Sequence, residues 1–216
     1  YSSRRNVVYA KNGVCCTSVP LGAQVGLDVL KNGGNAVDAA VAMAGAMPLL
    51  EPTGNGLGSD CFALVWIEKE KKLYGLNASG VAPMALSADE VRAKGFSEVP
   101  EEGWIPTMVP GAPTGWAALN RRFGTKPLSE LFAPAISYAE NGYAVPVNVG
   151  KLWARDSKRI ARVMAQDPAP YEYWWKCFMK LDGSPYRAGD VFRFPAYADT
   201  MRSLAETNCE SYYRGE

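Results

Sequence analysis

The segment KNGGNAVDAAVA, residues 31–42, constrains the fold more than any other part of the chain. Gly33 and Gly34 are suited to end one helix, because glycine readily adopts the positive φ of a helix C-terminus. Asn35 is placed to cap a second helix, and Asp38 lies in its first turn, where a carboxylate interacts favourably with the helix dipole. The sequence therefore predicts two consecutive helices, residues 21–32 and residues 36–49.

The second of these helices consists mainly of small apolar residues and carries no charge beyond Asp38. Small side chains let a helix approach its neighbours closely, so we expect it in a dense layer between a sheet and other helices. Its apolar run, residues 39–50, is shorter than the ~20 residues that a membrane span needs. Leucine in place of Ala40 or Ala44 is expected to overpack this layer.

Further elements are predicted from hydrophobic periodicity and capping residues. The predicted strands are 14–18 and a hairpin of 61–67 with 73–77. A capping box of Ser87 and Glu90 predicts the start of a short helix. Longer helices are predicted at 115–123, at 129–141 with Ser129 as its cap, and at 147–165. The aromatic residues between Tyr171 and Phe178 are interpreted as a satellite core under a long loop.

Six long segments, in order along the chain, resemble the start of the large subunit of γ-glutamyltranspeptidases. They are PLGAQVGLDVL (20–30), KNGGNAVDAAVA (31–42), EPTGNGLGSDCFALVW (51–66), VPGAPTGWAAL (109–119), RFGTKPLSELFAPAISYAENGYAVP (122–146) and SYYRGE (211–216). The resemblance implies an α+β fold, the four-layer αββα sandwich of Ntn-hydrolases. Residues 1–216 would be a single domain, the N-terminal, large-subunit part. It also implies a precursor that cuts itself in two, so the expected partner is the small subunit from the same precursor.

No nucleophile is recognisable within the chain. The sequence contains no histidine, which excludes a Ser-His-Asp or Cys-His arrangement. The resemblance implies that the nucleophile is a threonine at the start of the small subunit, with its own α-amine as general base, and places it beyond Glu216. The implied reaction is amide hydrolysis or acyl transfer through an acyl-enzyme, on a small-molecule γ-glutamyl or related acyl amide.

The stretch LNASGVAP, residues 76–83, bears on the substrate. In glutathione-processing members of the family, the corresponding stretch carries an arginine that grips the α-carboxylate of the substrate, and alignment of Ala82 and Pro83 puts Ser79 at that position. A serine offers one hydrogen bond and not a planar bidentate fork. Ser79 is therefore the candidate substrate-binding residue, and it places the γ-glutamyl substrate in question. Alternatively, the loop is shifted and Arg92 or another basic residue substitutes.

The glycine-rich loop GNGLGSD, residues 54–60, admits a second interpretation, because such loops can place backbone amides around a phosphate. Its spacing differs from G-x-G-x-x-G, and β-rich residues follow where a dinucleotide fold needs a helix. We favour the interpretation that the loop is a tight turn, which leads into a strand that passes a crowded helix. Ser59 and Asp60 replace glycines common in relatives, which suggests a polar pair near a cleft. Two alternative functions stay open: a nucleotide-binding α/β protein, and a non-catalytic large-subunit-like binding or structural protein.

The amino-acid composition limits the classes of partner and cofactor that we expect. A net charge of +1 without a basic stripe gives no reason to expect nucleic acid or a membrane. Five cysteines without a CxxC pair, and with no histidine, predict neither a metal nor a cofactor site; free buried thiols in a reducing compartment are the simplest interpretation. Residues 1–5 lack the apolar segment of a secretion signal, which favours the cytoplasm without deciding the compartment.

Overall fold

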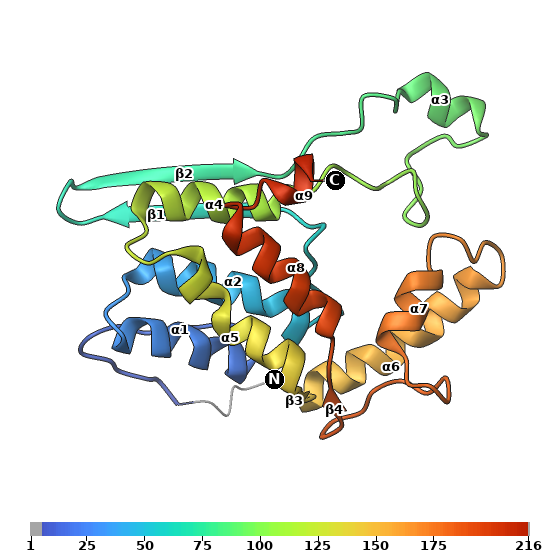
Figure 1. Ribbon diagram of the computed structural model, residues 1–216. Helices are drawn as coiled ribbons and strands as arrows, with labels where there is room; N and C mark the ends of the chain where they lie inside the picture. The colour runs from blue at the N-terminus through green and yellow to red at the C-terminus, as the bar shows by residue number, and fades with distance from the viewer. Residues whose placement is uncertain (1–5, 216) are drawn as a thin grey trace.

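The computed structural model describes residues 6–215 and shows a mixed α+β fold (Figure 1). The helices are α1 (Pro20–Lys31), α2 (Ala36–Leu50), α3 (Ala88–Ala93), α4 (Ala112–Phe123), α5 (Leu128–Asn141), α6 (Val147–Met164), α7 (Glu172–Phe178), α8 (Pro195–Glu206) and α9 (Ser211–Arg214). The strands are β1 (Cys61–Ile67), β2 (Lys72–Ala78), β3 (Tyr143–Ala144) and β4 (Val191–Phe192). The predicted helices and the hairpin are thus present, with ends displaced by a few residues. No helix among the described residues is long and apolar enough to cross a bilayer.

Helix α2 forms the centre of the core and contacts α1, α4 and α5. Ala42 and Ala46 have no exposed surface, and a Cβ added to Gly45 would meet the Phe132 ring at 2.8 Å. The prediction of a densely packed core helix is therefore confirmed. The expected overpacking at Ala40 is wrong, because Ala40 is exposed and the buried alanines lie on the other side of the helix.

The predicted cap of α2 is present and makes more contacts than expected. The Asn35 side chain accepts hydrogen bonds from the backbone of Val37 and Asp38, while Asp38 Oδ2 accepts the Asn35 N–H at 2.9 Å. Asp38 is fully buried and also accepts Thr125 N–H at 2.9 Å and Thr125 Oγ1 at 2.5 Å. Burial alone would raise the pKa of Asp38, but the hydrogen bonds from Thr125, Asn35 and Lys126 leave it below its ordinary value. Asp38 thereby joins the start of α2 to the turn between α4 and α5.

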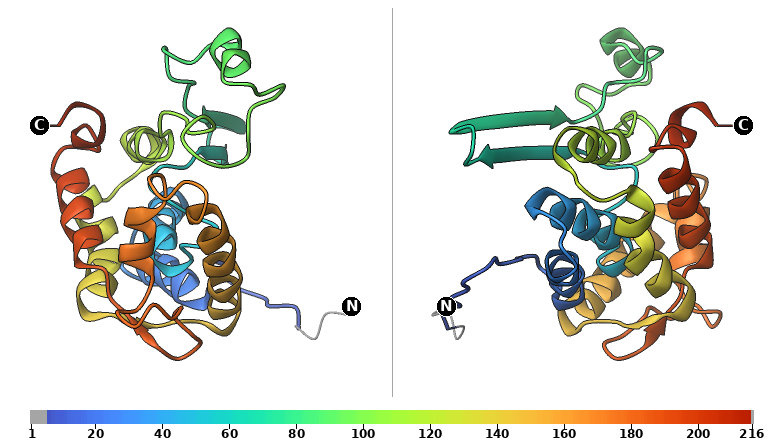
Figure 2. Two further views of the ribbon diagram at one scale, coloured as in Figure 1. Left: turned by 90° about the vertical axis from the view of Figure 1, so that its right-hand side faces the viewer. Right: turned by 60° about the vertical axis from the view of Figure 1, so that its left-hand side comes forward.

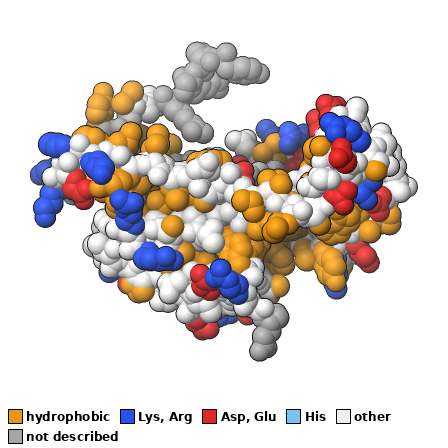
Figure 3. Space-filling view, turned by 90° about the horizontal axis from the view of Figure 1, so that it is seen from above, with side chains coloured by type: hydrophobic (Ala, Val, Ile, Leu, Met, Phe, Trp, Pro, Cys, Tyr) orange, Lys and Arg blue, Asp and Glu red, His pale blue; other side chains and the backbone are white. Residues whose placement is uncertain are grey.

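Strands β1 and β2 pair antiparallel, with Cys61 opposite Ala78 and Ile67 opposite Lys72. One face of this hairpin packs on α4 and includes Ala63, Val65 and Leu76. The outer face exposes a row of large apolar side chains, Phe62, Leu64, Trp66 and Leu73. In the space-filling view from above, hydrophobic side chains gather over this region (Figure 3). The described residues thus contain one hairpin layer backed by helices, which is part of a four-layer sandwich.

Two local predictions are wrong. Residues 14–18 form no strand and pair with none among the described residues, and Cys15 and Thr17 instead lie against Gly26 and Gly22 of α1. A strand needs a hydrogen-bonding neighbour, which an apolar pattern alone cannot supply. Helix α5 begins at Leu128 after Pro127, so Ser129 lies inside the first turn and does not cap it.

The satellite aromatic cluster has a different membership from the predicted one. Tyr173 is 77% exposed, and of the predicted residues Trp174 and Phe178 pack against the core. Within the predicted segment the Trp174 ring meets those of Phe178 and Trp175. Phe178 also meets the rings of Trp153 in α6, Phe192 in β4 and Phe194 after β4, and these three partners could not be expected from sequence proximity. The five cysteines are free, but Cys209 alone of them is buried, so the expectation of buried thiols is wrong for the other four.

Candidate functional site

Ser79 directly follows β2 and is half-buried. Its N–H donates to Asn77 Oδ1 at 3.0 Å, and its hydroxyl donates to the Gly80 carbonyl at 3.3 Å. Both bonds are local, and neither is made to a charged group. The position therefore presents a small polar side chain at the end of a strand.

The backbone around Ser79 is held by close contacts to the segment that precedes α4. Gly80 has φ +78°, and a Cβ there would lie 1.9 Å from the Val109 carbonyl oxygen. A Cβ on Gly111 would lie 2.0 Å from the Ala78 carbonyl oxygen. Because only glycine fits at both places, the two segments lie against each other with no room for side chains. Ser79 is consequently held between two backbone contacts.

The glycine-rich loop meets this junction through Ser59. The Ser59 carbonyl accepts the N–H groups of Gly111 at 3.1 Å and Ala112 at 2.8 Å, which satisfies donors at the start of α4. The Ser59 hydroxyl is used within the loop, where it donates to the Gly56 carbonyl at 2.5 Å. Ser59 thus contributes its backbone and not its side chain to this junction, and the expected polar pair of Ser59 and Asp60 near a cleft stays a prediction.

This loop does not have the geometry of a dinucleotide-binding turn. It leads into β1, which pairs antiparallel with β2, and no helix begins where a phosphate would bind. The loop glycines Gly54 and Gly58 are not crowded, since an added Cβ would meet nothing within 4 Å, but β1 does pass a crowded helix, because a Cβ added to Gly115 of α4 would lie 2.7 Å from the Cys61 Cβ. The nucleotide-binding alternative thus has no structural support in the described residues.

The end of the described chain lies at the same junction. Tyr213, in α9, donates its hydroxyl to the Pro110 carbonyl at 2.7 Å and accepts the Thr114 N–H at 3.3 Å. Figures 1 and 2 show α9 beside α4. Sequence reasoning missed the role of Tyr213, although it lies in the SYYRGE segment, because its partners are 99 and 103 residues away.

No basic side chain among the described residues makes a hydrogen bond to Ser79. Arg92, the predicted substitute for the missing arginine, lies on α3 with Nη1 3.1 Å from Asp89 Oδ1, and both side chains are exposed. No hydrogen bond or ion pair among the described residues connects Arg92 to Ser79. Substitution of the missing arginine by Arg92 or another basic residue therefore stays a prediction.

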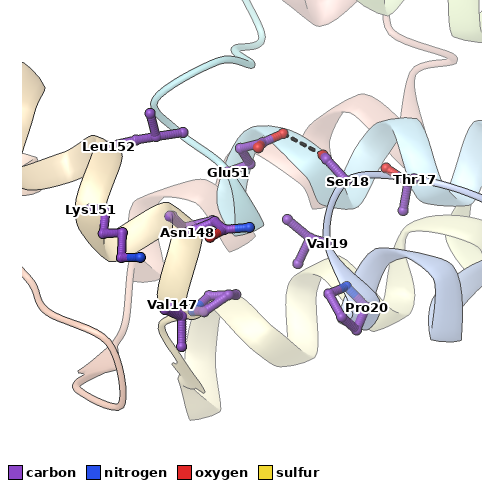
Figure 4. Close-up of a pocket in the computed structure, with 11 residues that line it drawn as sticks. Thr17, Ser18, Val19, Pro20, Glu51, Val147, Asn148, Lys151 and Leu152 are labelled. Carbon is purple, nitrogen blue, oxygen red and sulfur yellow. Dashed lines mark hydrogen bonds between the residues drawn. The ribbon is translucent and has the colours of Figure 1, made fainter. Parts of the chain in front are cut away.

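A groove of about 830 Å³ lies elsewhere, between the start of α1, the end of α2 and the start of α6 (Figure 4). On one side Ser18 donates to Glu51 Oε2 at 2.6 Å, and on the other lie Asn148 and Lys151. Asn55 of the glycine-rich loop also donates to Glu51, at 3.0 Å. The groove thus pairs a serine hydroxyl with a carboxylate, but it contains no histidine to act as the base of a Ser-His-Asp arrangement.

Three of the five thiols are disfavoured as nucleophiles by burial, which is partial at two of them. Burial raises the pKa of Cys15 and Cys61, and it raises the pKa of Cys209 to about 12. Thiols with raised pKa values stay protonated at neutral pH and are poor nucleophiles. Within residues 6–215, no group of three or more histidine, cysteine or carboxylate side chains is placed to hold a metal ion. The junction around Ser79 can thus contribute to binding, but the described residues offer no nucleophile.

Comparison with known proteins places these features in a family. The family model described as gamma-glutamyltranspeptidase matches residues 22–216. The crystal structure of cephalosporin acylase from Bacillus halodurans superimposes with a TM-score of 0.92 at 52% sequence identity, covering 100% of this chain and 39% of that one. Glutathione hydrolase proenzyme of Bacillus subtilis is 28% identical over 221 residues, which is 100% of this chain and 36% of the relative.

A third relative is oxamate amidohydrolase proenzyme of Klebsiella pneumoniae, 33% identical over 210 residues, or 94% of this chain and 38% of the relative. The chain spans well under half the length of these three proteins. Its fold corresponds to their N-terminal nucleophile hydrolase type in the large-subunit part, as the sequence predicted. The match over nearly all of its length means that the chain belongs to the γ-glutamyltranspeptidase family.

Proposed function

We propose that this chain forms the large-subunit part of an amide hydrolase or acyl transferase of the γ-glutamyltranspeptidase type. The family match over residues 22–216 is the observation that carries the proposal. The reaction runs through an acyl-enzyme on a threonine that becomes an N-terminus beyond Glu216, with its α-amine as general base. The absence of histidine and of an activated thiol in the described residues agrees with a nucleophile outside this chain.

The partner is the small subunit from the same precursor, and we assign it to the outer face of the β1–β2 hairpin. Phe62, Leu64 and Trp66 are 64%, 78% and 53% exposed on that face. Burying apolar surface contributes ~25 cal/mol for each Å², and a contiguous exposed row of this kind is typical of a protein interface. The remaining length of the relatives, two of which are named as proenzymes, is sufficient to supply the covering segment.

The acyl group is one without an α-amino acid head. A bidentate hydrogen bond between arginine and a carboxylate is charge-assisted, and such bonds contribute ~1.5 to 3 kcal/mol. Ser79 lacks that interaction, and no basic side chain among the described residues makes a hydrogen bond to it. Two of the relatives are named for acyl groups other than γ-glutamyl, a cephalosporin acylase and an oxamate amidohydrolase. A simple acyl or glutaryl amide therefore suits this position better than a γ-glutamyl amide.

The test uses the complete protein, including the sequence beyond Glu216. Intact mass and N-terminal sequencing should reveal two chains, the smaller beginning with threonine, and the preparation should hydrolyse acyl anilides. Alanine in place of that threonine should abolish both cleavage and hydrolysis. An uncut protein that hydrolyses no anilide would contradict the proposal and favour the non-catalytic binding protein.

A further inference from the structure

Residues 81–109 form an excursion, called here the arm, that begins two residues after Ser79. The arm contains α3 and stands away from the helical core (Figures 1 and 2). Its base is closed where Val109 N–H donates to the Val81 carbonyl at 2.9 Å. Because Gly80 and Val109 touch without room for a Cβ, a displacement of the arm at its base also displaces the backbone of Ser79.

The far part of the arm is fixed to α6 and α7 by a cluster of three side chains, called here the clasp. The Glu102 carboxylate accepts Arg159 Nη1 at 2.5 Å and the Tyr171 hydroxyl at 2.6 Å. The Gly103 N–H donates to the same Tyr171 oxygen at 3.0 Å. Arg159 belongs to α6 and Tyr171 immediately precedes α7, so the clasp joins the arm to residues 57 and 69 positions later in the chain.

The charge state of Glu102 suits this role. Hydrogen bonds from Tyr171 and Arg159 lower the pKa of Glu102, so it is ionised at neutral pH. Glu102 and Arg159 are 36% and 46% exposed, and an isolated ion pair so exposed contributes little to stability. The clasp differs from such a pair because both carboxylate oxygens are used and a backbone N–H joins the same cluster.

The other side-chain hydrogen bonds made by the described arm residues are local. Ser87 bonds to Glu90, Arg92 to Asp89, and Thr107 to the Gly103 carbonyl. These contacts stabilise α3 and one turn, but they do not fix the arm to another part of the molecule. Fixation through polar side chains therefore depends on the clasp.

We propose that Glu102, Arg159 and Tyr171 are positioning residues that act through the arm on the segment containing Ser79, and that they set the KM for the acyl substrate. This inference rests on the proposed function. Small displacements of a binding group weaken productive binding, whereas the threonine nucleophile and its α-amine lie outside this chain. Loss of the clasp should therefore raise KM and leave kcat nearly unchanged.

The test compares Tyr171→Phe, Glu102→Gln and Arg159→Lys with wild type in the complete processed enzyme. Glu101→Gln is the matched control, because Glu101 is exposed on the same loop and makes no side-chain hydrogen bond in the described structure. Hydrogen–deuterium exchange measures protection of residues 81–109, and acyl anilide kinetics give KM and kcat. Tyr171→Phe should speed exchange in the arm and raise KM about threefold to tenfold, with kcat within about twofold. Arg159→Lys keeps the positive charge and should retain part of the clasp, so it should change KM and exchange less than Tyr171→Phe does.

The inference would be overturned by unchanged exchange in the arm after Tyr171→Phe, or by faster exchange with KM the same as in Glu101→Gln. A fall in kcat equal to the fall in kcat/KM would also contradict a positioning role through binding. Failure of the proposed function is distinguishable, because it would appear as lack of hydrolysis in the wild type, while the exchange measurement would still test the clasp.

Discussion

Helix α2 and the arm are held in place by different forces. Helix α2 is surrounded by other helices and buries Ala42 and Ala46 completely, so van der Waals packing fixes it on several sides. The arm exposes Met84 and Trp104 and is fixed at two places, by backbone contacts at its base and by the clasp. Displacing α2 requires rearrangement of the core, whereas releasing the arm requires the loss of a few polar contacts.

This difference separates the scaffold from the substrate-binding part. The junction around Ser79 lies between them, since Gly111 leads into α4 of the core and Gly80 leads into the arm. Core substitutions should therefore change stability, and arm substitutions should change substrate binding. Substitutions in the core and in the exposed parts of the chain can test that separation.

The largest effect concerns the bare face of the hairpin. Residues 1–216 produced alone should show no detectable amide hydrolysis and should aggregate, because Leu64 and Trp66 stay exposed and no nucleophile is present. Light scattering and an anilide assay, with the complete processed protein as control, make the comparison. Intact mass showing that an active preparation contains only this 216-residue chain would contradict the prediction.

Among single substitutions in the core, loss of the buried Asp38 carboxylate should destabilise the protein most. Asp38→Ala leaves the Thr125 and Asn35 donors without an acceptor and should lower the free energy of unfolding by about 2 to 4 kcal/mol. Asp89→Ala is the control, because Asp89 is exposed on α3. Denaturant titration of the complete protein measures both, and equal midpoints for the two variants would show that Asp38 is not a structural centre.

Overpacking tests the density around α2 directly. Ala42→Leu should destabilise the protein by about 1 to 3 kcal/mol, because Ala42 has no exposed surface and neighbours on every side. Ala40→Leu, two residues away on the exposed side, should change stability by less than about 0.5 kcal/mol. Thermal unfolding of the two variants should therefore differ, and a neutral Ala42→Leu would mean that the core is loosely packed.

A smaller effect should appear in the pH dependence of stability. The folded-state pKa of Asp38 lies below its unfolded value of about 4, so the carboxylate contributes stability that is fully present above that pH. The contribution is lost as pH falls from about 4 through the folded-state pKa. Unfolding midpoints between pH 7 and pH 3 should fall less steeply in Asp38→Asn than in wild type. Parallel curves would contradict the assigned pKa direction.

Local sequence patterns predicted the elements whose contacts are close in sequence. The Asn35 cap and the capping box of Ser87 with Glu90 are both present, because the residues that form each lie within three positions of one another. The exposed side of α2 could not be predicted, since a helix of small apolar residues has no polar stripe to mark it. Residues 14–18 were misassigned because strand formation depends on a neighbour and not only on the segment itself.

The candidate site was less predictable than the fold. Ser79 was found through the alignment of the family segment, but its fixation by Gly80, Val109 and Gly111 depends on contacts between distant segments. The clasp joins residues 57 and 69 positions apart, and Asp38 meets Thr125 87 positions away. A single sequence contains no periodicity or spacing that specifies such pairs.

The most direct measurement is the ratio of kcat/KM for a simple acyl or glutaryl anilide to kcat/KM for a γ-glutamyl anilide. It should be made in the complete processed enzyme, for wild type and Ser79→Arg. Since a charge-assisted hydrogen bond contributes ~1.5 to 3 kcal/mol, Ser79→Arg should raise efficiency on the γ-glutamyl compound by roughly tenfold to a hundredfold and lower the ratio accordingly. A wild type that strongly prefers the γ-glutamyl compound, with no improvement in Ser79→Arg, would show that another residue binds the carboxylate and would contradict the assignment of Ser79.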